Sequence, residues 1–401
     1  MESSVKVADQ VYWVGMNDRE SPLFESIWPL PNGVSYNSYL ILDQKIALLD
    51  TVKKISAPNY LTQLKRLIPA GKLVDYLVVH HLEPDHSGAI PMLLQLYPKL
   101  QIFGTKKAAE FLKNLYNITD NVTVVTDGDE LDLGQRRLKF VATPMVHWPE
   151  TMMSYEPRDK ILFSGDAFGG FGALDGGIFD DTVDIEYYES EILRYFSNIV
   201  GKFAPMVQKA IVKLKGLEIR IVASTHGPVW RSRPDRIIEL YDRWSRHEPE
   251  EGVVVAYGSM YGNTEKMMES VVRGLAQEGL RTVRVHNVSK SHNSFIISDI
   301  WRYRGLILGS PTYDAKLLPQ AESLVSLLAD KMLRNRCVGI FGSCGWSGGA
   351  VKSLQEFVTR SGLELVEPVI EARFAANAEQ LEKCFELGRK VASTVLRGTA
   401  N

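Results

Sequence analysis

The sequence predicts an α/β and α+β two-domain protein, in which a mixed two-sheet domain precedes a doubly wound parallel sheet. The chain has 401 residues, more than one hydrophobic core usually serves. A charged segment with Pro and Gly, residues 245–252, separates two differently patterned halves. In the second half, apolar β-branched runs alternate with amphipathic helical patterns, as parallel strands joined by helical crossovers require. We therefore predict domains at residues 1–250 and 251–401.

The first half begins with strands and turns and continues as a mixture of strands and helices. Apolar runs at 36–42 and 45–50 flank Asp43-Gln44 and predict a β-hairpin. Apolar residues at helical spacing predict a helix at 60–68, and the apolar run at 73–79 predicts a buried strand. Such a mixture suits two sheets with helices packed outside them. We expect further strands at 122–126, 138–142 and 161–164, and further helices at 189–200 and 204–214.

The second half has a more regular pattern, in which each apolar run is followed by a segment of helical periodicity. This alternation is the reason for predicting a parallel sheet with helices on both faces. We expect strands at 253–257, 283–285, 305–309 and 337–341, and helices at 264–275, 321–332, 350–361 and 378–396.

The composition argues against several classes of protein. A formal net charge of −2 at pH 7 argues against a surface for nucleic acid or anionic membrane, which needs a basic patch. Residues 1–10 have no secretory-signal pattern, and no apolar run is long enough to span a bilayer. Cys337, Cys344 and Cys384 are too widely spaced for a disulfide framework and indicate a reducing compartment, so we expect a cytoplasmic protein. No Cys-x-x-Cys pair occurs, so we expect no rubredoxin-type iron centre within the chain.

A dense group of metal-binding residue types follows the predicted strand at 73–79. It contains His81, Glu83, Asp85 and His86 and precedes a loop that enters a helix. Side chains at a strand end are held by a rigid element yet stay accessible, as a catalytic site requires. The alternative, a polar turn with incidental histidines, is weakened by three similar positions further along the chain.

Those three positions are His147, Asp166 and His226, each of which follows a predicted strand. One metal ion needs three or four protein ligands, whereas two metals sharing a bridging carboxylate need about seven. Histidine and carboxylate without thiolate suit iron, manganese or zinc, and the high carboxylate share favours the harder, redox-active ions. Strand alternation points His80 away from His81, so we treat His80 as a non-ligand, with the alternative that it donates a hydrogen bond to a ligand.

The second half has its own candidate site at three strand ends. Residues 259–264 follow the strand at 253–257 and open a helix, and the hydroxyl and N–H groups there can cradle a phosphate. The loop lacks the Lys of a nucleoside-triphosphate site. Residues 309–314 and 342–349 end two further strands of the predicted sheet. Taken singly each loop could be an ordinary βα turn, but their order within one domain favours a bound mononucleotide.

The metal-binding residues resemble the diiron site of the flavodiiron proteins, which lies on a metallo-β-lactamase-like αββα sandwich, and the resemblance covers essentially the whole chain. The segment 259–264 resembles the phosphate loop of flavodoxins, which bind FMN. Hydrolytic relatives of the metallo-β-lactamase type carry His where this chain has Glu83. The resemblance implies that His81, Glu83 and His147 hold one iron, that Asp85, His86 and His226 hold the other, and that Asp166 bridges them.

For the flavodoxin-like domain, the resemblance implies that the three loops bind FMN and that Trp346 can stack on the flavin ring. Cys344 is expected to be a small loop residue and not a redox thiol. The expected FMN-binding residues are Ser259, Met260, Tyr261, Gly262, Asn263 and Thr264 in the first loop, Pro311, Thr312, Tyr313 and Asp314 in the second, and Ser343, Gly345, Trp346 and Gly348 in the third.

The chain departs from the family pattern at two positions. Gly165 precedes the expected bridging Asp where many members have Asn, and Glu25 stands where a His is frequent near the substrate pocket. The second departure bears on the residues that deliver protons and not on the metal ligands.

The resemblance implies an enzyme that reduces O2 to water, NO to nitrous oxide, or both, at the diiron centre formed by these ligands. It also implies FMN as the immediate electron donor, a head-to-tail homodimer or a dimer of dimers, and an external donor such as rubredoxin, a reduced deazaflavin or a reductase. Two rival interpretations stay open. One is a zinc hydrolase of the metallo-β-lactamase type fused to a flavodoxin-like regulatory domain, and the other is a non-catalytic electron carrier.

Overall fold

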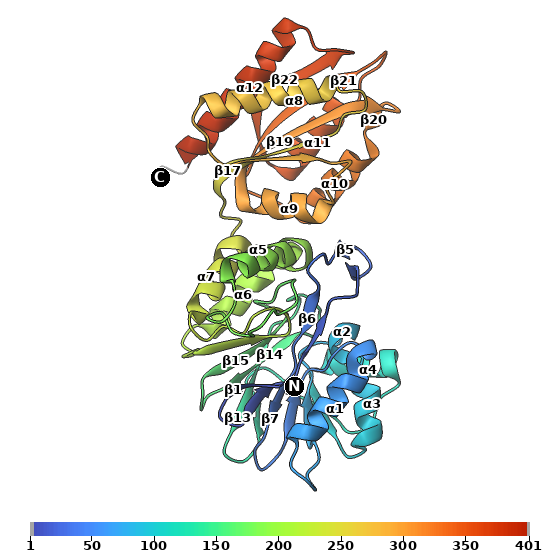
Figure 1. Cartoon of the computed structure of the whole chain (residues 1–401), viewed down its shortest axis with the longest axis vertical. Coiled ribbons are helices and arrows are strands. Elements are labelled where there is room, and N and C mark those ends of the chain that lie inside the picture. Colours follow the sequence, from blue (N-terminus) through green and yellow to red (C-terminus); the bar gives the residue numbers. More distant parts are fainter. Residues whose placement is uncertain (1–3, 399–401) are drawn as a thin grey trace. The chain divides into compact units, whose positions relative to one another are not determined.

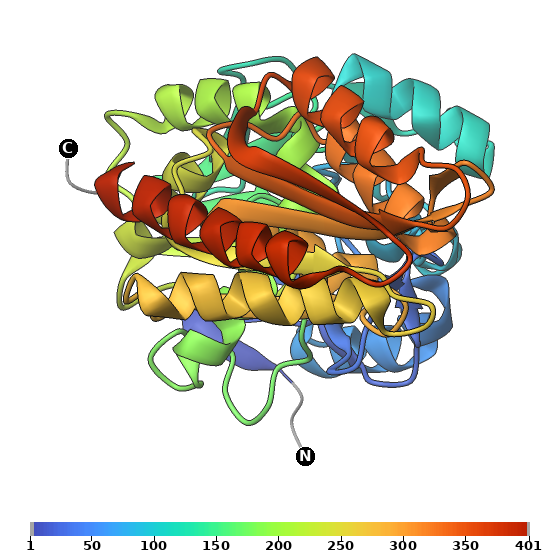
Figure 2. The same cartoon turned by 90° about the horizontal axis from the view of Figure 1, so that it is seen from above.

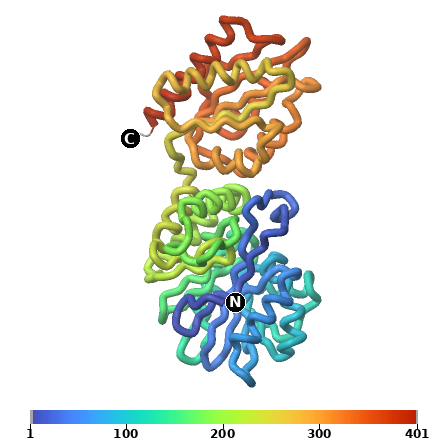
Figure 3. Tube along the Cα trace, in the orientation of Figure 1, coloured from blue at the N-terminus to red at the C-terminus, as the bar shows by residue number. Residues whose placement is uncertain are grey.

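The computed structural model describes residues 4–398, so the termini of the two predicted domains, 1–3 and 399–401, lie outside the described residues. Contacts within the chain divide it into Met1–Ser245 and Arg246–Asn401 (Figures 1 and 3). The predicted boundary between residues 250 and 251 falls inside strand β17 (Glu250–Tyr257). Among the described residues, no helix has the length and apolar character needed to cross a membrane.

The N-terminal unit contains two sheets packed face to face. The ring centroids of Tyr39 and Phe163, one from each sheet, lie 5.2 Å apart in the core. Helices cover the outer sides (Figure 1). The larger sheet has the order β1 (Val5–Ala8), β2 (Val11–Trp13), β7 (Tyr39–Ile41), β8 (Ala47–Leu49), β9 (Tyr76–Val78), β10 (Gln101–Gly104) and β11 (Val122–Val124). The smaller sheet has the order β12 (Glu130–Asp132), β13 (Arg137–Ala142), β14 (Met152–Glu156), β15 (Ile161–Gly165) and β16 (Ile221–Ser224).

The remaining elements of this unit are helices and two small ribbons. The ribbons pair β3 (Met16–Asp18) with β6 (Val34–Tyr36) and β4 (Leu23–Phe24) with β5 (Trp28–Pro29). The helices are α1 (Ala57–Leu67), α2 (Pro84–Ser87), α3 (Ile90–Leu96), α4 (Lys106–Tyr116), α5 (Ile185–Tyr195), α6 (Ala204–Leu214) and α7 (Pro234–Ser245).

Most elements expected in the first half are present. The predicted hairpin is the antiparallel pair β7–β8, and the helix predicted at 60–68 starts earlier, as α1, because Pro58 suits a first helical turn. The helix predicted at 189–200 is α5 up to Tyr195, after which the backbone continues as a π-helix over Phe196–Val200. The short strands β1 to β5 correspond to the strands expected at the start of the chain, for which no bounds were predicted, and β10, β12, β14, α2, α4 and α7 were not predicted.

The C-terminal unit is built on a parallel sheet with the strand order β18–β17–β19–β21–β22. The first strand therefore has neighbours on both sides, which is the doubly wound arrangement predicted from the alternating pattern. The strands are β17, β18 (Val283–Asn287), β19 (Tyr303–Tyr313), β21 (Cys337–Cys344) and β22 (Glu364–Arg373), with β20 (Lys316–Leu317) attached to β19. The helices are α8 (Asn263–Gln277), α9 (Asn293–Arg302), α10 (Pro319–Asp330), α11 (Ala350–Ser361) and α12 (Ala378–Gly398).

Helices α8 and α12 lie side by side on one face of this sheet (Figure 2). Two glycines permit their close approach, because a Cβ at Gly274 would collide with the Phe385 carbonyl and one at Gly388 with the Val271 carbonyl. Strand β22 and helix α9 were not predicted. Strand β22 escaped prediction because it contains Pro368 and is only half buried, so it lacks the apolar run of a central strand.

The start of the C-terminal unit is fixed by the buried side chain of Arg336. Its guanidinium donates hydrogen bonds to the carbonyls of Ile300, Trp301 and His247. The ring of His247 packs against Trp301 with centroids 4.8 Å apart, and its backbone has a φ of 55°. Burial, together with the positive charge of Arg336, lowers the pKa of His247 to about 4.

We expect His247 to make the C-terminal unit less stable as the pH falls. The folded state keeps the imidazole neutral, whereas the unfolded chain binds a proton near pH 6.5, so stability is present above that pH and is lost towards pH 4. The loss between pH 7 and pH 5 is about 2 kcal/mol for this group. Urea unfolding at both pH values measures it. In His247→Asn, which tolerates the positive φ, the loss should be smaller, and an equal loss in both proteins would contradict the assignment.

Candidate metal centre and phosphate-loop cavity

The structure brings all seven predicted metal ligands to one edge of the two-sheet unit. His81 follows β9 of the larger sheet, and Glu83 directly precedes the short helix α2, which carries Asp85 and His86. The other three residues belong to the smaller sheet, where they follow strand ends. They are His147, in the loop between β13 and β14, Asp166, directly after β15, and His226, after β16.

The first group of ligands consists of His81, Glu83, His147 and Asp166, whose candidate ligand atoms all lie within 4.8 Å of one another. His147 Nε2 is 3.1 Å from a Glu83 oxygen and 3.0 Å from Asp166 Oδ2. His81 Nε2 is 3.1 Å from the same Asp166 oxygen. Ligands bound about 2.1 Å from one ion lie roughly 3 Å apart, so this group has the spacing of a single metal site.

The second group consists of Asp85, His86 and His226. The Nε2 atoms of His86 and His226 are 2.9 Å apart, and Asp85 Oδ2 lies 3.3 Å from the first and 3.4 Å from the second. Asp166 Oδ1 is 3.1 Å from His86 Nε2. The two oxygens of Asp166 therefore face different groups, which is the arrangement of a carboxylate shared by two ions.

The chemistry of the cluster fits a pair of cations. Several of its polar atoms are buried without a hydrogen-bond partner among the described residues, including Glu83 Oε2, His81 Nε2 and both Asp85 oxygens. Buried polar atoms are normally satisfied by hydrogen bonds or by coordination to a metal. A cation bound by each group would satisfy these atoms, so the residues present fit two metal ions.

The electrostatics of the cluster are those of closely packed opposite charges. Burial disfavours the imidazolium form, but the carboxylates of Asp166 and Glu83 outweigh it and raise the pKa of His147 to about 9. The same carboxylates raise the pKa of His81 well above its usual value. Burial also opposes ionisation of Asp166, yet the charges of His81 and His86 hold its pKa well below the ordinary range. The site therefore favours an ionised Asp166.

His80 does not contact the cluster. Its Nδ1 lies 2.5 Å from Asp50 Oδ2, its Nε2 lies 2.8 Å from Ser154 Oγ, and its backbone N–H donates to Asp50 Oδ1. Both ring nitrogens are thus engaged by residues outside the ligand groups, in keeping with the prediction of a non-ligand. The alternative in which the ring donates to a ligand is wrong. His80 instead fixes the backbone from which His81 projects.

Two hydroxyl groups at the cluster were not predicted. The Thr225 hydroxyl donates to Asp166 Oδ1 at 2.5 Å, and the Tyr195 hydroxyl donates to Asp166 Oδ2 at 2.9 Å. Thr225 directly precedes His226, so its position in the sequence was a usable signal. Tyr195 lies at the end of α5, far from every ligand in the sequence, and no local pattern marks it.

The two departures from the family pattern have clear structural settings. Gly165 has a φ of 59°, a backbone conformation that both Gly and Asn tolerate. Glu25 and Ser26 lie in the three-residue turn, 25–27, between β4 and β5, with positive φ at both positions. Glu25 stays accessible at the surface, yet the protein packed around its carboxyl and the charge of Glu83 raise its pKa to about 7. Trp28 Nε1 donates to Glu25 at 3.2 Å.

Aromatic side chains enclose the second ligand group. Phe24 meets His226 edge-on with ring centroids 5.6 Å apart, and Tyr36 packs against both His226 and His86. Tyr195 also packs against His226, at 5.4 Å. These rings keep the histidines in place and leave little room for bulk water beside them.

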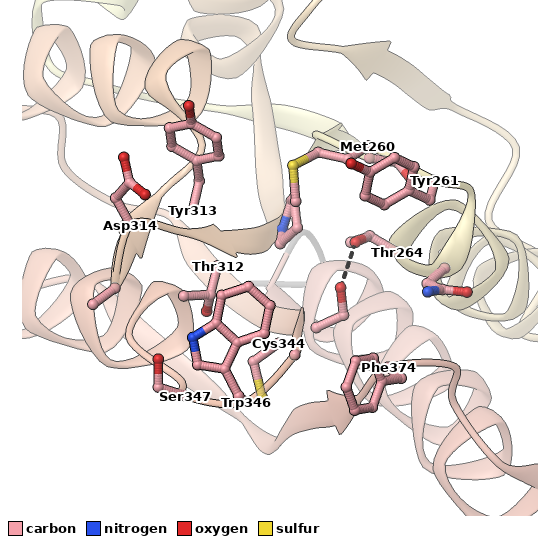
Figure 4. A pocket seen from close by; sticks show the side chains of 16 residues that line it. Met260, Tyr261, Thr264, Thr312, Tyr313, Asp314, Cys344, Trp346, Ser347 and Phe374 are labelled. Carbon is pink, nitrogen blue, oxygen red and sulfur yellow. Dashed lines mark hydrogen bonds between the residues drawn. The ribbon is translucent and has the colours of Figure 1, made fainter.

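In the C-terminal unit, a cavity of about 560 Å³ opens where β17, β19 and β21 end (Figure 4). Its volume is that of a typical small-ligand site. The predicted residues lie in the three loops at these ends, and twelve of them line the cavity, while Gly262 and Gly348 do not. Gly262 has a φ of 84° at the entry to α8, and Gly348 lies beside the Glu371 carboxylate, which would have to shift to admit a side chain there.

The cavity also has lining residues that were not predicted. Ala315, Ser347 and Phe374 belong to this set, and Cys344 lines the wall as well. Burial raises the pKa of Cys344, which fits the expected small loop residue and not a reactive thiolate. Phe374 was missed because it directly follows β22, the strand that the sequence pattern did not reveal.

The loop after β17 has the features of a phosphate cradle. Ser259 Oγ accepts a hydrogen bond from the Gly262 N–H at 3.1 Å, which closes the turn into α8. The Thr264 hydroxyl is buried and lies 2.9 Å from Ser343 Oγ, so it points across the cavity floor (Figure 4). Hydroxyls and free N–H groups at a helix start suit a phosphate monoester.

The mouth of this cavity carries large exposed aromatic side chains. Trp346 is 87% exposed and Tyr261 is 88% exposed. Both line the cavity and are seen at its rim in Figure 4. Exposed aromatic groups around a cavity commonly mark the contact surface of a ligand or a partner.

Comparison with known proteins agrees with this architecture. Residues 34–227 match the ODP family beta lactamase model, and residues 255–388 match the flavodoxin model. A nitric oxide reductase of Moorella thermoacetica is 36% identical, over 98% of this chain and 100% of its own. The rubredoxin oxygen:oxidoreductase of Desulfovibrio gigas superposes with a TM-score of 0.95 at 31% identity, over all of both chains. A flavodiiron protein of Giardia intestinalis has a TM-score of 0.93 at 28% identity, over 98% of this chain and 97% of its own.

Proposed function

The chain belongs to the flavodiiron proteins, and from this we propose that it reduces O2 to water, NO to nitrous oxide, or both, at a non-haem diiron site. The observation that carries the proposal is the Asp166 carboxylate, whose two oxygens face two separate groups of ligands. FMN in the cavity of the C-terminal unit relays electrons to this site from an external donor.

Iron is the metal that best suits the donor set. The cluster combines four histidines with three carboxylates and no thiolate, which favours a hard, redox-active ion over zinc. When bound, a carboxylate-bridged iron pair stores two electrons and binds small diatomic ligands. Because the carboxylates and histidines are buried, the negative charge of the carboxylates must be balanced by the bound ions and not by solvent. One ion would be held by His81, Glu83 and His147, the other by Asp85, His86 and His226, and Asp166 would be shared.

FMN suits the second cavity. The phosphate would bind at residues 259–264, where Thr264 and the free N–H groups of α8 can donate to it. The flavin ring would lie between the loops after β19 and β21, where Trp346 can stack on it. FMN accepts and donates electrons singly or in pairs. It could therefore take electrons from a donor that gives one at a time and supply a metal pair that needs two.

We propose an external electron donor, for which a rubredoxin, a reductase or a reduced deazaflavin would serve. The name of the Desulfovibrio gigas relative points to rubredoxin for that protein. A cytoplasmic location is proposed on the free cysteines, since none forms a disulfide among the described residues.

A head-to-tail homodimer, alone or paired into a dimer of dimers, is proposed because the metal cluster and the cavity belong to different compact units. In such a dimer the flavin of one subunit serves the metal site of its partner. The aromatic rim of the cavity would then be covered by the second copy, which accounts for its apolar character.

The hydrolase interpretation is not favoured. A carboxylate, Glu83, occupies the position where hydrolytic relatives carry His, and similar proteins of full length include a nitric oxide reductase and an oxygen oxidoreductase. A non-catalytic carrier is not favoured either, because it leaves the buried cluster of seven ligands without a role.

The purified protein is expected to contain about two irons and one FMN per chain. Chemically reduced under anaerobic conditions, it should reoxidise and consume gas when mixed with O2 or NO, measured with gas-selective electrodes and flavin absorbance. Zinc in place of iron, together with hydrolysis of a lactam or thioester, would establish the hydrolase instead.

Substitutions should separate the two cofactors. Asp166→Ala or His147→Ala is expected to lose iron and gas reduction while FMN stays bound, because neither residue belongs to the C-terminal unit. Thr264→Ala should weaken FMN binding about 10- to 100-fold, since it removes a hydrogen bond to a charged group, and should leave the iron content unchanged.

Metal analysis and fluorescence titration of FMN measure both effects. Thr359→Ala, an exposed threonine on α11, is the matched control. Loss of both cofactors in either variant would contradict independent sites.

The dimer proposal predicts complementation between two inactive variants. Asp166→Ala keeps the flavin site and Thr264→Ala keeps the metal site, so a mixed dimer would contain one productive pair. Coexpression of differently tagged chains at low FMN should recover about a quarter of wild-type activity if subunits pair at random. No recovery from a verified mixed dimer, or a fully active monomer in sedimentation, would exclude the head-to-tail arrangement.

A further inference from the structure

The Asp166 carboxylate accepts one hydroxyl hydrogen bond on each of its oxygens. Thr225 donates to Oδ1 at 2.5 Å, and Tyr195 donates to Oδ2 at 2.9 Å. All three side chains are buried. Oδ1 also faces His86 Nε2 at 3.1 Å, so Thr225 lies on the side of the second ligand group.

The backbone around Thr225 is anchored at several points. Its N–H donates to the carbonyl of Gly165, the residue before Asp166, and its own carbonyl accepts from the Asn37 N–H at 2.7 Å. The Asn37 side chain donates to the carbonyls of Ser224 and Gly227, which flank the segment. Trp13 Nε1 in turn holds the Asn37 side-chain oxygen at 2.8 Å. The Thr225 hydroxyl therefore has a fixed position relative to Asp166.

A bridging carboxylate must direct one lone pair of each oxygen at a different ion. An aspartate can also turn so that both oxygens face the same ion, which would leave the second group one ligand short. The Thr225 hydroxyl bonds to the oxygen that faces His86 and His226, and it opposes such a turn. It also draws charge from that oxygen, so its loss would strengthen any Asp166–iron bond that remains, but a carboxylate that has turned away makes no bond to the second ion.

Resting on the diiron function proposed above, we propose that Thr225 is a positioning residue that keeps Asp166 in its bridging orientation. Its hydroxyl acts through Asp166 and does not itself bind metal. The group most dependent on it is the second one, because the oxygen that accepts from Thr225 is Oδ1, which faces His86 and His226. Loss of the hydroxyl should therefore weaken binding of the second ion more than binding of the first.

The test compares Thr225→Val, which keeps the shape of the side chain and removes the hydroxyl, with Thr225→Ser, which keeps the hydroxyl. Thr225→Val should bind the second Fe(II) about 10- to 100-fold more weakly, measured anaerobically by competition with a chelator, while the first Fe(II) and FMN stay bound. The reduction potential of any iron pair that remains should become more negative, because Asp166 then donates more charge. Thr225→Ser should behave like wild type in both measurements.

A matched control is Thr143→Val, because Thr143 is a buried threonine of the same unit whose hydroxyl makes no hydrogen bond to any described residue. It should bind both ions normally. The proposal is overturned if Thr225→Val binds two ions with wild-type affinity and potential, or if Thr225→Ser is impaired like the hydroxyl-free variants. Should Thr225→Val fail to fold, the comparison of Thr225→Ala with Thr225→Ser decides by the same criteria. A wild-type protein that binds no iron would instead refute the diiron function itself.

Discussion

The shared carboxylate of Asp166 is the interaction on which the N-terminal site depends. Its two oxygens lie 3.0 to 3.1 Å from three histidines, of which His81 and His86 belong to the segment after β9 and His147 to the loop between β13 and β14. Removing the negative charge of Asp166 would leave the buried histidines without their partner, and the folded state would lose several kcal/mol of stability. The two sheets, the short helix α2 and the anchored segment around Thr225 can all be understood as means of holding these groups at fixed separations.

Burial and charge act in opposite directions at this site, and charge prevails. Desolvation alone would make the histidines neutral and Asp166 protonated, yet their proximity reverses both tendencies. A cation bound by each group would take over the role of the imidazolium protons and allow the carboxylates to remain ionised. The protein thus maintains a buried set of negative charges whose natural partners are metal ions, and metal binding and folding of this unit are linked.

The sequence was most informative where chemistry follows a strand end. All seven candidate ligands could be selected because His, Asp and Glu stand in the loops that follow apolar runs, and the loops of the phosphate cavity could be selected in the same way. Tyr195 and Phe374 could not, because each reaches its site through tertiary packing and has no local pattern. Strand β22 was hidden by Pro368 and by partial exposure, and the missing strand concealed Phe374. Glu25 was noticed only by comparison with a family pattern, and its turn conformation was not foreseen.

Separation of the flavin cavity and the metal cluster into two compact units has a functional consequence. Each site can be built by the fold that best suits it. The flavin cavity uses the strand ends of a parallel sheet, which bind phosphate, and the metal cluster uses loops that converge at one edge of two packed sheets. The reaction, however, needs electrons to pass from one site to the other before a bound gas is released half-reduced. The head-to-tail dimer proposed above would meet that need without any change in either fold, because each copy presents an exposed aromatic rim at its flavin cavity that a partner would cover. Catalysis would then belong to the assembled pair of subunits, while cofactor binding belongs to each unit alone.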